Sequence, residues 1–155
     1  MPLSHLEHIL VQTRDIEATT RWYVDVLGMR VGYTPDFKFP VKWLYIGEQD
    51  VIHVTEGGAG TTANRKAYLG QQSEATSGTG VIDHIAFRAT GLRETLERLR
   101  RLAVDFKERQ VDDQGLYQVF FFDPNGIKVE LNFKAEEAAA LGLKPGLKAS
   151  ELIGQ

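Results

Sequence analysis

The chain contains one half-chain pattern twice, and this internal repeat constrains the fold more than any other feature. Two short apolar segments, one near the start and one in the middle, carry His8 and His84 at the same place, and a helical pattern follows each. In each half, a further strand-like segment with a polar residue follows at nearly the same distance from the first histidine. His53 lies 45 residues after His8, and Glu130 lies 46 residues after His84. The repeat predicts two copies of one module, each with a polar side chain on its first and last strands.

Hydrophobic periodicity gives each half the element order β-α-β-β-β. The strands of the first half are expected at residues 6–13, 29–33, 41–46 and 51–55. Those of the second half are expected at residues 81–89, 104–108, 116–122 and 127–133. Asp15 is a good N-cap for the first helix and Gly28 a natural end to it, while Thr90 is expected to cap the second helix.

Residues 57–80 separate the two halves. They are rich in Gly, Ser, Thr and Ala and lack clear periodicity, so we expect a connecting loop that could also act as a lid. The expected organisation is a single domain over residues 1–133, built from module one (5–56), this loop and module two (81–133). An alanine-rich helical tail is expected over residues 134–155.

Composition excludes several kinds of site and partner. The chain has no cysteine, which rules out disulfides, thiolate metal sites and cysteine nucleophiles. Its net charge of −3, with both signs interspersed, argues against a nucleic-acid partner. No apolar run approaches the ~20 residues that span a bilayer, and the first residues do not form a signal peptide. We therefore expect a cytoplasmic protein without a membrane partner.

The polar residues at the repeat-related positions are candidates for a metal site. If a pseudo-twofold axis relates the halves, His8 matches His84 and His53 matches Glu130, and the four side chains converge in a cavity between curved sheets. Two neutral imidazoles and one carboxylate form the 2-His-1-carboxylate triad, which leaves coordination positions open for substrate and, with Fe(II), for oxygen. Mn(II), Ni(II), Co(II) and Zn(II) also bind such nitrogen and oxygen donors.

A single histidine on a strand is more often structural than functional, but the joint pattern favours function. Three of the four histidines fall at repeat-related strand positions, whereas His5 lies before the first strand and is interpreted as incidental. Glu130 takes the remaining position between Val129 and Leu131, where an unpaired buried carboxylate would be costly.

Residues 5–133 resemble the vicinal oxygen chelate superfamily, which includes glyoxalase I, fosfomycin- and bleomycin-resistance proteins, methylmalonyl-CoA epimerase and extradiol ring-cleaving dioxygenases. The resemblance is carried by the segments LEHILVQTRDIEATTRWYVDVLGM, VIDHIAF and FFFDPNGIKVEL. It implies an α+β fold in which two tandem βαβββ modules form a cup-shaped mixed sheet around a divalent metal ion. It also implies His8, His84 and Glu130 as metal ligands, a small-molecule substrate bound through vicinal oxygens, and a homodimer.

His53 is the residue that separates the reactions of this superfamily. The equivalent position is typically a glutamate in glyoxalase I and a glutamine in the epimerase, whereas ring-cleaving dioxygenases can carry a histidine there as acid–base catalyst. The favoured expectation is an extradiol-type dioxygenase with Fe(II) and His53 as the catalytic residue, although His53 could be a fourth ligand. The alternative is a glyoxalase I-like lyase or isomerase with Ni(II), Zn(II) or Co(II). An antibiotic-resistance binding protein ranks third, because sequestration needs no metal ligands.

Aromatic side chains near these strands are the expected substrate contacts. They are Trp43, Tyr45, Tyr117, Phe120 and Phe122. The ring-cleaving dioxygenases usually carry a tyrosine ten residues before the metal-binding glutamate, where this chain has Phe120. Tyr117 lies three residues earlier, on the opposite face of a regular strand, so this departure counts against the dioxygenase.

Overall fold

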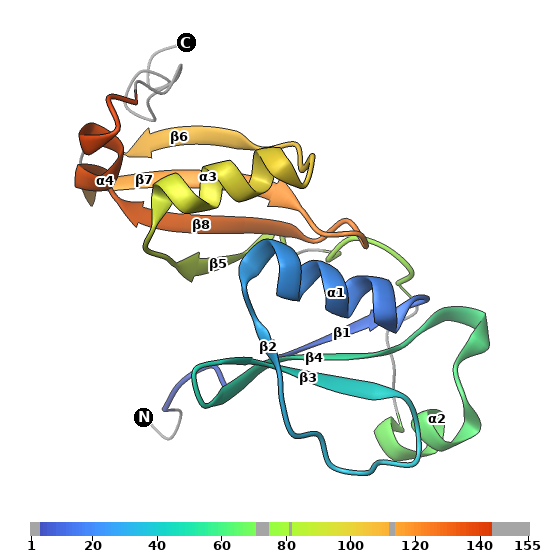
Figure 1. Ribbon diagram of the computed structural model, residues 1–155. Helices are drawn as coiled ribbons and strands as arrows, with labels where there is room; N and C mark the ends of the chain where they lie inside the picture. The colour runs from blue at the N-terminus through green and yellow to red at the C-terminus, as the bar shows by residue number, and fades with distance from the viewer. Residues whose placement is uncertain (1–3, 71–74, 81, 112–113, 144–155) are drawn as a thin grey trace. The chain divides into compact units, whose positions relative to one another are not determined.

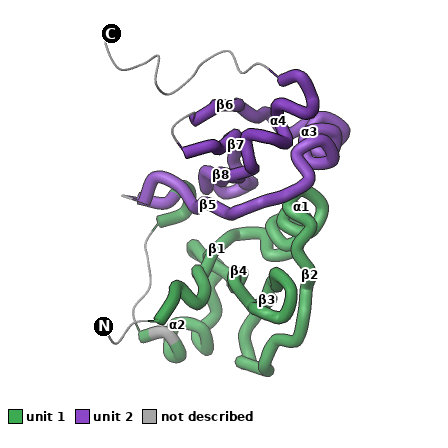
Figure 2. The backbone as a smooth tube through the Cα atoms, turned by 90° about the vertical axis from the view of Figure 1, so that its left-hand side faces the viewer, with its two compact units in different colours: residues 1–78 green, residues 79–155 purple. Residues whose placement is uncertain are grey.

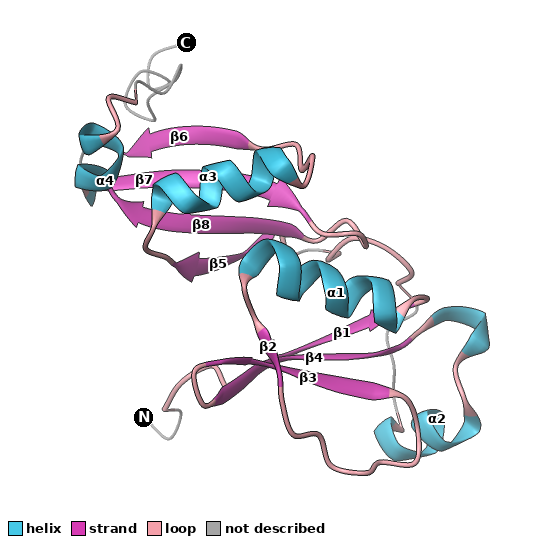
Figure 3. Cartoon of the chain, viewed as in Figure 1, coloured by secondary structure: helices cyan, strands magenta, loops and turns pink. Residues whose placement is uncertain are grey.

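The computed structural model describes residues 4–70, 75–80, 82–111 and 114–143 (Figure 1). The chain divides into two compact units, unit 1 over residues 1–78 and unit 2 over residues 79–155 (Figure 2). Each unit holds one four-stranded mixed sheet with its own helices (Figure 3). The predicted α+β fold of two tandem βαβββ modules is therefore confirmed.

Unit 1 begins with the β-α-β-β-β order that the repeat predicts. Its elements are β1 (Ile9–Thr13), α1 (Ile16–Leu27), β2 (Arg30–Val31), β3 (Val41–Ile46) and β4 (Gln49–Glu56), followed by the short 3-10 helix η1 (Gly58–Gly60) and α2 (Ala63–Leu69). The sheet has the order β1-β4-β3-β2, with β1 parallel to β4 and the other neighbours antiparallel. The first strand of the unit therefore lies beside its last strand.

Unit 2 repeats this arrangement. Its elements are β5 (His84–Arg88), α3 (Leu92–Arg101), β6 (Lys107–Val111), β7 (Leu116–Phe122), β8 (Lys128–Lys134) and α4 (Ala135–Ala140). The sheet order is β5-β8-β7-β6, and β5 again runs parallel to the last strand, β8. Among the described residues, no helix combines the length and apolar character needed to cross a bilayer.

The ends of α1 follow the predicted signals. Asp15 accepts a hydrogen bond from the Ala18 backbone N–H at 2.8 Å, and Gly28 ends the helix in the left-handed conformation with φ 71°. Tyr23 and Val26 are buried on the side of α1 that packs against β3 and β4. The two caps fix the length of α1, and the spacing of its buried residues sets the face that it presents to the sheet.

In each sheet, one face carries apolar side chains and the other carries polar ones. On β8, the apolar residues Val129, Leu131 and Phe133 are buried and alternate with Lys128, Glu130, Asn132 and Lys134. On β4, Ile52 and Val54 are buried in the same core as Leu44, while His53 and Thr55 point to the opposite face. The alternation supplies a core on one side and presents the predicted polar residues on the other.

Two local expectations are wrong. Residues 57–80 were expected to lack regular structure, but α2 lies within them and begins after Thr62, whose hydroxyl accepts a hydrogen bond from the Arg65 N–H. Thr90 does not cap α3, which begins after Gly91. The cap comes instead from α4, because Glu137 Oε2 accepts hydrogen bonds from the N–H groups of Gly91 at 2.9 Å and Leu92 at 2.8 Å.

Glu137→Ala should lower the free energy of unfolding of unit 2 by about 1–2 kcal/mol, because it removes the cap and a negative charge from the start of α3. Glu136→Ala is the matched control, since Glu136 is exposed on the same helix turn. Urea unfolding followed by circular dichroism measures both variants. Equal stability of the two variants would contradict a capping role for Glu137.

Candidate metal-binding site

The four polar residues at the repeat-related positions form two close pairs, one in each unit. In unit 1, the rings of His8 and His53 stack with their centroids 3.9 Å apart and their planes 19° from parallel. In unit 2, His84 Nε2 lies 3.0 Å from Glu130 Oε2. In each module, the start of the first strand and the last strand thus bring their polar side chains together, whereas convergence of all four side chains stays a prediction.

An acidic residue precedes the histidine on the first strand of each module, and its carboxylate lies against the imidazole. Glu7 Oε1 is 3.1 Å from His8 Nδ1, and Asp83 Oδ1 is 2.8 Å from His84 Nδ1. Such a carboxylate favours the tautomer with its hydrogen on Nδ1 and makes the other nitrogen a better metal ligand. Both histidines are therefore set to offer Nε2.

A buried hydrogen-bond network holds the carboxylate of Glu130, whose side chain is 8% exposed. Its Oε1 accepts hydrogen bonds from Gln118 Nε2 at 2.8 Å and from Asn132 Nδ2 at 2.7 Å. Gln118 is held in turn by Arg109, which donates from Nε and Nη2 to its Oε1 at 2.8 and 2.6 Å. This Glu130 network (Arg109, Gln118, Glu130 and Asn132) satisfies Oε1 and directs Oε2 at His84.

His53 is held by a ring on each side and a carboxylate at one edge. The Trp43 ring stacks on it at 4.1 Å with an interplanar angle of 3°, opposite His8, and the His53 side chain is 10% exposed. Its Nε2 lies 2.7 Å from Asp50 Oδ2. Burial lowers the pKa of His53 below its ordinary value, against the opposing effect of Asp50, so the imidazole is neutral at neutral pH. The hydrogen bond with His53 lowers the pKa of Asp50.

Sequence reasoning missed Asp50, which lies between the strands expected at residues 41–46 and 51–55. It belongs to β4, and residues three apart on a regular strand face opposite sides. The β3–β4 register shifts between Leu44 and Tyr45, so that Val51 is an extra residue on β4. This bulge brings Asp50 and His53 to the same side. With His8 they form a second donor set, with ligand atoms within 4.8 Å of one another.

Two of the predicted aromatic contacts lie beside the polar pairs. Trp43 stacks on His53, and Phe120 is paired opposite Glu130 across β7 and β8, with its ring edge-on to His84 at 6.5 Å between centroids. Phe120 thus occupies the place where the ring-cleaving dioxygenases are expected to carry a tyrosine. Its ring provides no hydroxyl group to a bound ligand.

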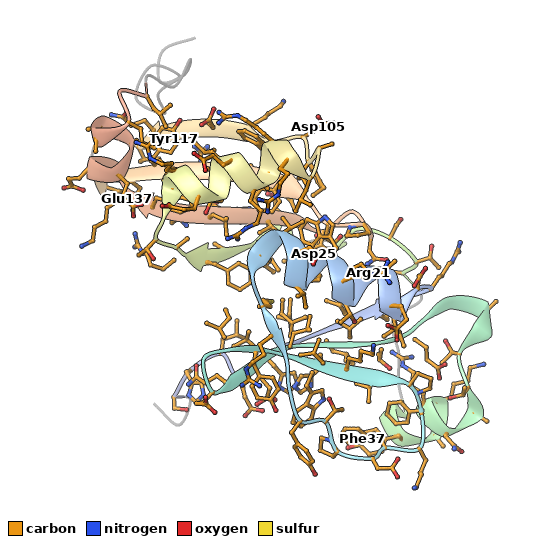
Figure 4. All side chains as sticks on the ribbon, viewed as in Figure 1. Arg21, Asp25, Phe37, Asp105, Tyr117 and Glu137 are labelled. Atoms are coloured by element: carbon orange, nitrogen blue, oxygen red, sulfur yellow. The ribbon has the colours of Figure 1, made fainter. Side chains whose placement is uncertain are left out.

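The other three predicted aromatic contacts have different surroundings. The Tyr45 hydroxyl donates to the Tyr33 carbonyl oxygen at 2.7 Å. Phe122 is 60% exposed and lines a cavity of about 480 Å³ with Phe120. Tyr117 is buried on the opposite face of β7, where its hydroxyl donates to Glu108 Oε1 at 2.8 Å and burial raises its pKa (Figure 4).

Comparison with known proteins identifies the family. The model of the Glyoxalase/Bleomycin resistance protein/Dioxygenase superfamily matches residues 5–131, so the chain belongs to this superfamily, as its sequence resemblance predicted. The fosfomycin resistance protein FosX from Listeria monocytogenes is 22% identical, with a TM-score of 0.61, and the match covers 87% of this chain and 97% of FosX.

Two further solved structures share the fold. Lactoylglutathione lyase from Agrobacterium tumefaciens is 19% identical, with a TM-score of 0.63, over 86% of this chain and 96% of the lyase. A FosX mutant in complex with Mn(II) and a dihydroxypropylphosphonic acid is 22% identical, with a TM-score of 0.57, over 84% of this chain and 90% of that one. These likenesses establish the architecture, and the reaction has to be argued from the residues.

Gln118→Leu should lower the free energy of unfolding by about 1–3 kcal/mol, because it leaves the buried Glu130 carboxylate and Arg109 each short of a hydrogen-bond partner. Gln49→Leu makes the same chemical change at an exposed strand position and should alter stability by less than about 0.5 kcal/mol. Urea unfolding compares the two variants. A loss no larger than that of Gln49→Leu would show that the Glu130 network does not stabilise unit 2.

Proposed function

We propose that the protein is a divalent-metal-dependent enzyme that acts on a small substrate bound through vicinal oxygens, with His8, His84 and Glu130 as metal ligands. The observation that carries the proposal is the 3.0 Å approach of His84 Nε2 to Glu130 Oε2, with the other oxygen of the carboxylate held by the Glu130 network. Superfamily membership supports it. A homodimer and a cytoplasmic location remain predictions.

The chemistry of the donors fits a divalent transition metal. Two imidazole nitrogens and one carboxylate oxygen suit Fe(II), which we favour, and also Mn(II), Co(II), Ni(II) and Zn(II). Asp83 on His84 Nδ1 and Glu7 on His8 Nδ1 are the partners that metal-binding histidines usually have. A bound ion of this kind would hold both vicinal oxygens of the substrate and, as Fe(II), would supply electrons to oxygen.

For the reaction, we propose extradiol-type ring cleavage of a catechol-like substrate. His53 supports it, because a neutral imidazole beside His8 can take the proton of a substrate hydroxyl. Asp50 holds Nε2 of that imidazole and would stabilise the imidazolium formed by proton transfer. Trp43 fixes the plane of the ring.

A glyoxalase-like lyase or isomerase is the second candidate, and two observations favour it. Phe120 gives the substrate no hydroxyl donor beside Glu130, and Tyr117 donates its hydroxyl to Glu108 on the other face of the sheet. Asp50 adds a carboxylate beside His53, and a reaction that moves a proton between carbon atoms can use such a pair.

Glu130→Gln should weaken Mn(II) binding sharply, because it removes the carboxylate charge with little change in shape. Changes to groups that only support a ligand cost about 10–100-fold in metal affinity, so loss of a ligand charge should cost at least as much. Asp50→Asn is the matched control, since it makes the same change in the second donor set. Isothermal titration measures both variants. Weak binding by Asp50→Asn with normal binding by Glu130→Gln would assign the metal to His8, Asp50 and His53 instead.

Protein loaded anaerobically with Fe(II) should consume oxygen when it is offered catechols or hydroquinones, and catechols should give a yellow ring-fission product. His53→Ala should retain Fe(II) and lose turnover by about 100-fold or more, because it removes the proton acceptor. An oxygen electrode and iron analysis provide both readouts. No uptake by protein that holds one Fe(II) per site would favour the lyase, and loss of iron from His53→Ala would make His53 a ligand.

A further inference from the structure

A cavity of about 310 Å³ in unit 1 has one polar side and one aromatic side. The polar side is formed by His8, Asp50 and His53, the residues that stack or hydrogen-bond with one another beside β4. The aromatic side is formed by side chains from three separate segments, namely Phe37, Phe39, Trp43 and Tyr68. Apart from Trp43, none of these aromatic residues was among the expected substrate contacts.

The aromatic side is a connected cluster. Ring centroids lie 5.6 Å apart for Phe37 and Phe39, 5.4 Å for Phe37 and Tyr68, 5.5 Å for Phe39 and Tyr68, and 6.0 Å for Phe37 and Trp43. The four rings are tilted or edge-on to one another, which is the usual preference of packed aromatic side chains. Trp43 then continues the cluster to His53 through its stacked ring.

The backbone is shaped to hold this cluster together. Lys38 adopts a left-handed conformation with φ 61°, and its N–H donates to Asp36 Oδ1 at 3.1 Å, so that the chain turns between Phe37 and Phe39. On α2, Asn64 Nδ2 donates to the Lys38 carbonyl oxygen at 2.9 Å. This bond ties the helix that carries Tyr68 to the loop that carries the two phenylalanines. Figure 4 shows Phe37 on that loop.

The cluster is not a closed core. Tyr68 is 63% exposed, and Phe37 and Phe39 are half-buried. When a ligand covers such solvent-exposed apolar surface, the free energy of the complex falls, which favours binding. The charges of the lining side chains disfavour a negatively charged ligand. Glu7 and Asp50 line the cavity, and no lysine or arginine does so among the described residues. A negatively charged substituent on the ligand would therefore find no lysine or arginine partner among these lining residues and would lie near two carboxylates.

We propose that this cavity binds one uncharged aromatic ring whose vicinal hydroxyl groups point toward His8 and His53. The inference rests on the proposed function in taking His8 as a metal ligand, and it adds that the substrate is an uncharged monocyclic aromatic diol. A volume at the lower end of the range for ligand pockets suits one ring with small substituents. Phe37, Phe39 and Tyr68 are the residues that select the ring.

Metal-free protein titrated with three probes tests this selection by calorimetry. The probes are 4-methylcatechol, cyclohexane-1,2-diol, which keeps vicinal oxygens without an aromatic ring, and 3,4-dihydroxybenzoate, which adds a negative charge. We expect 4-methylcatechol to bind at least about tenfold more tightly than either of the others, through its contact with the aromatic side. Equal or tighter binding of the saturated diol or of the benzoate would overturn the inference.

Phe37→Leu combined with Tyr68→Leu should weaken 4-methylcatechol binding by about tenfold, because leucine keeps apolar bulk and removes the aromatic faces. Tyr33→Leu is the control, since Tyr33 is 77% exposed and does not line the cavity. Urea unfolding verifies that the double variant is folded, and unchanged binding by a folded double variant would overturn the inference. Selective binding without oxygen uptake by the Fe(II)-loaded protein would reject ring cleavage and leave the aromatic pocket established.

Discussion

In each unit, the first strand pairs in parallel with the last, and this pairing creates the polar pairs on which the candidate site depends. Leu10 is paired with His53, and His8 lies two residues before Leu10 on the same face, so His8 reaches His53. In the same way, Ala86 is paired with Glu130, and His84 two residues before it reaches Glu130. Parallel neighbours need a long connection, which the helix and the two intervening strands supply. Residues about 45 positions apart in the sequence thereby become neighbours.

The polar face of each sheet buries polar groups, and hydrogen bonds offset the free-energy cost of removing these groups from water. Glu130 and Gln118 are both buried, and they hydrogen-bond to each other and to side chains of neighbouring strands. Arg109 lies over the Phe120 ring at 4.9 Å and also donates to Gln118, so one cation both shields and orders the network. Such an arrangement keeps the Glu130 carboxylate in one orientation before any ligand arrives.

The sequence was sufficient to predict the features that depend on periodicity. The repeat placed a polar residue on the first and on the last strand of each half, and Val129 and Leu131 indicated the buried surroundings of Glu130. Features that depend on irregular backbone were missed. Asp50 reaches His53 through a bulge, Phe37 and Phe39 meet through a left-handed Lys38, and Tyr68 joins them from a helix in a segment expected to be a loop. Hydrophobic periodicity cannot reveal these three features, because each one arises where the backbone departs from a regular strand or loop.

The N-terminal caps of α1 and α3 come from different places in the two modules. In unit 1 the cap of α1 is Asp15, one residue before the helix, so the module carries its own signal. In unit 2 the cap of α3 is Glu137, which follows the last strand by three residues. A chimeric chain built from two copies of unit 1 would carry the α1 cap within each β-α-β-β-β segment, whereas one built from two copies of unit 2 would have to keep residues through α4 in both copies. The segment after β8 therefore belongs to the folding unit and is not an appendage to it.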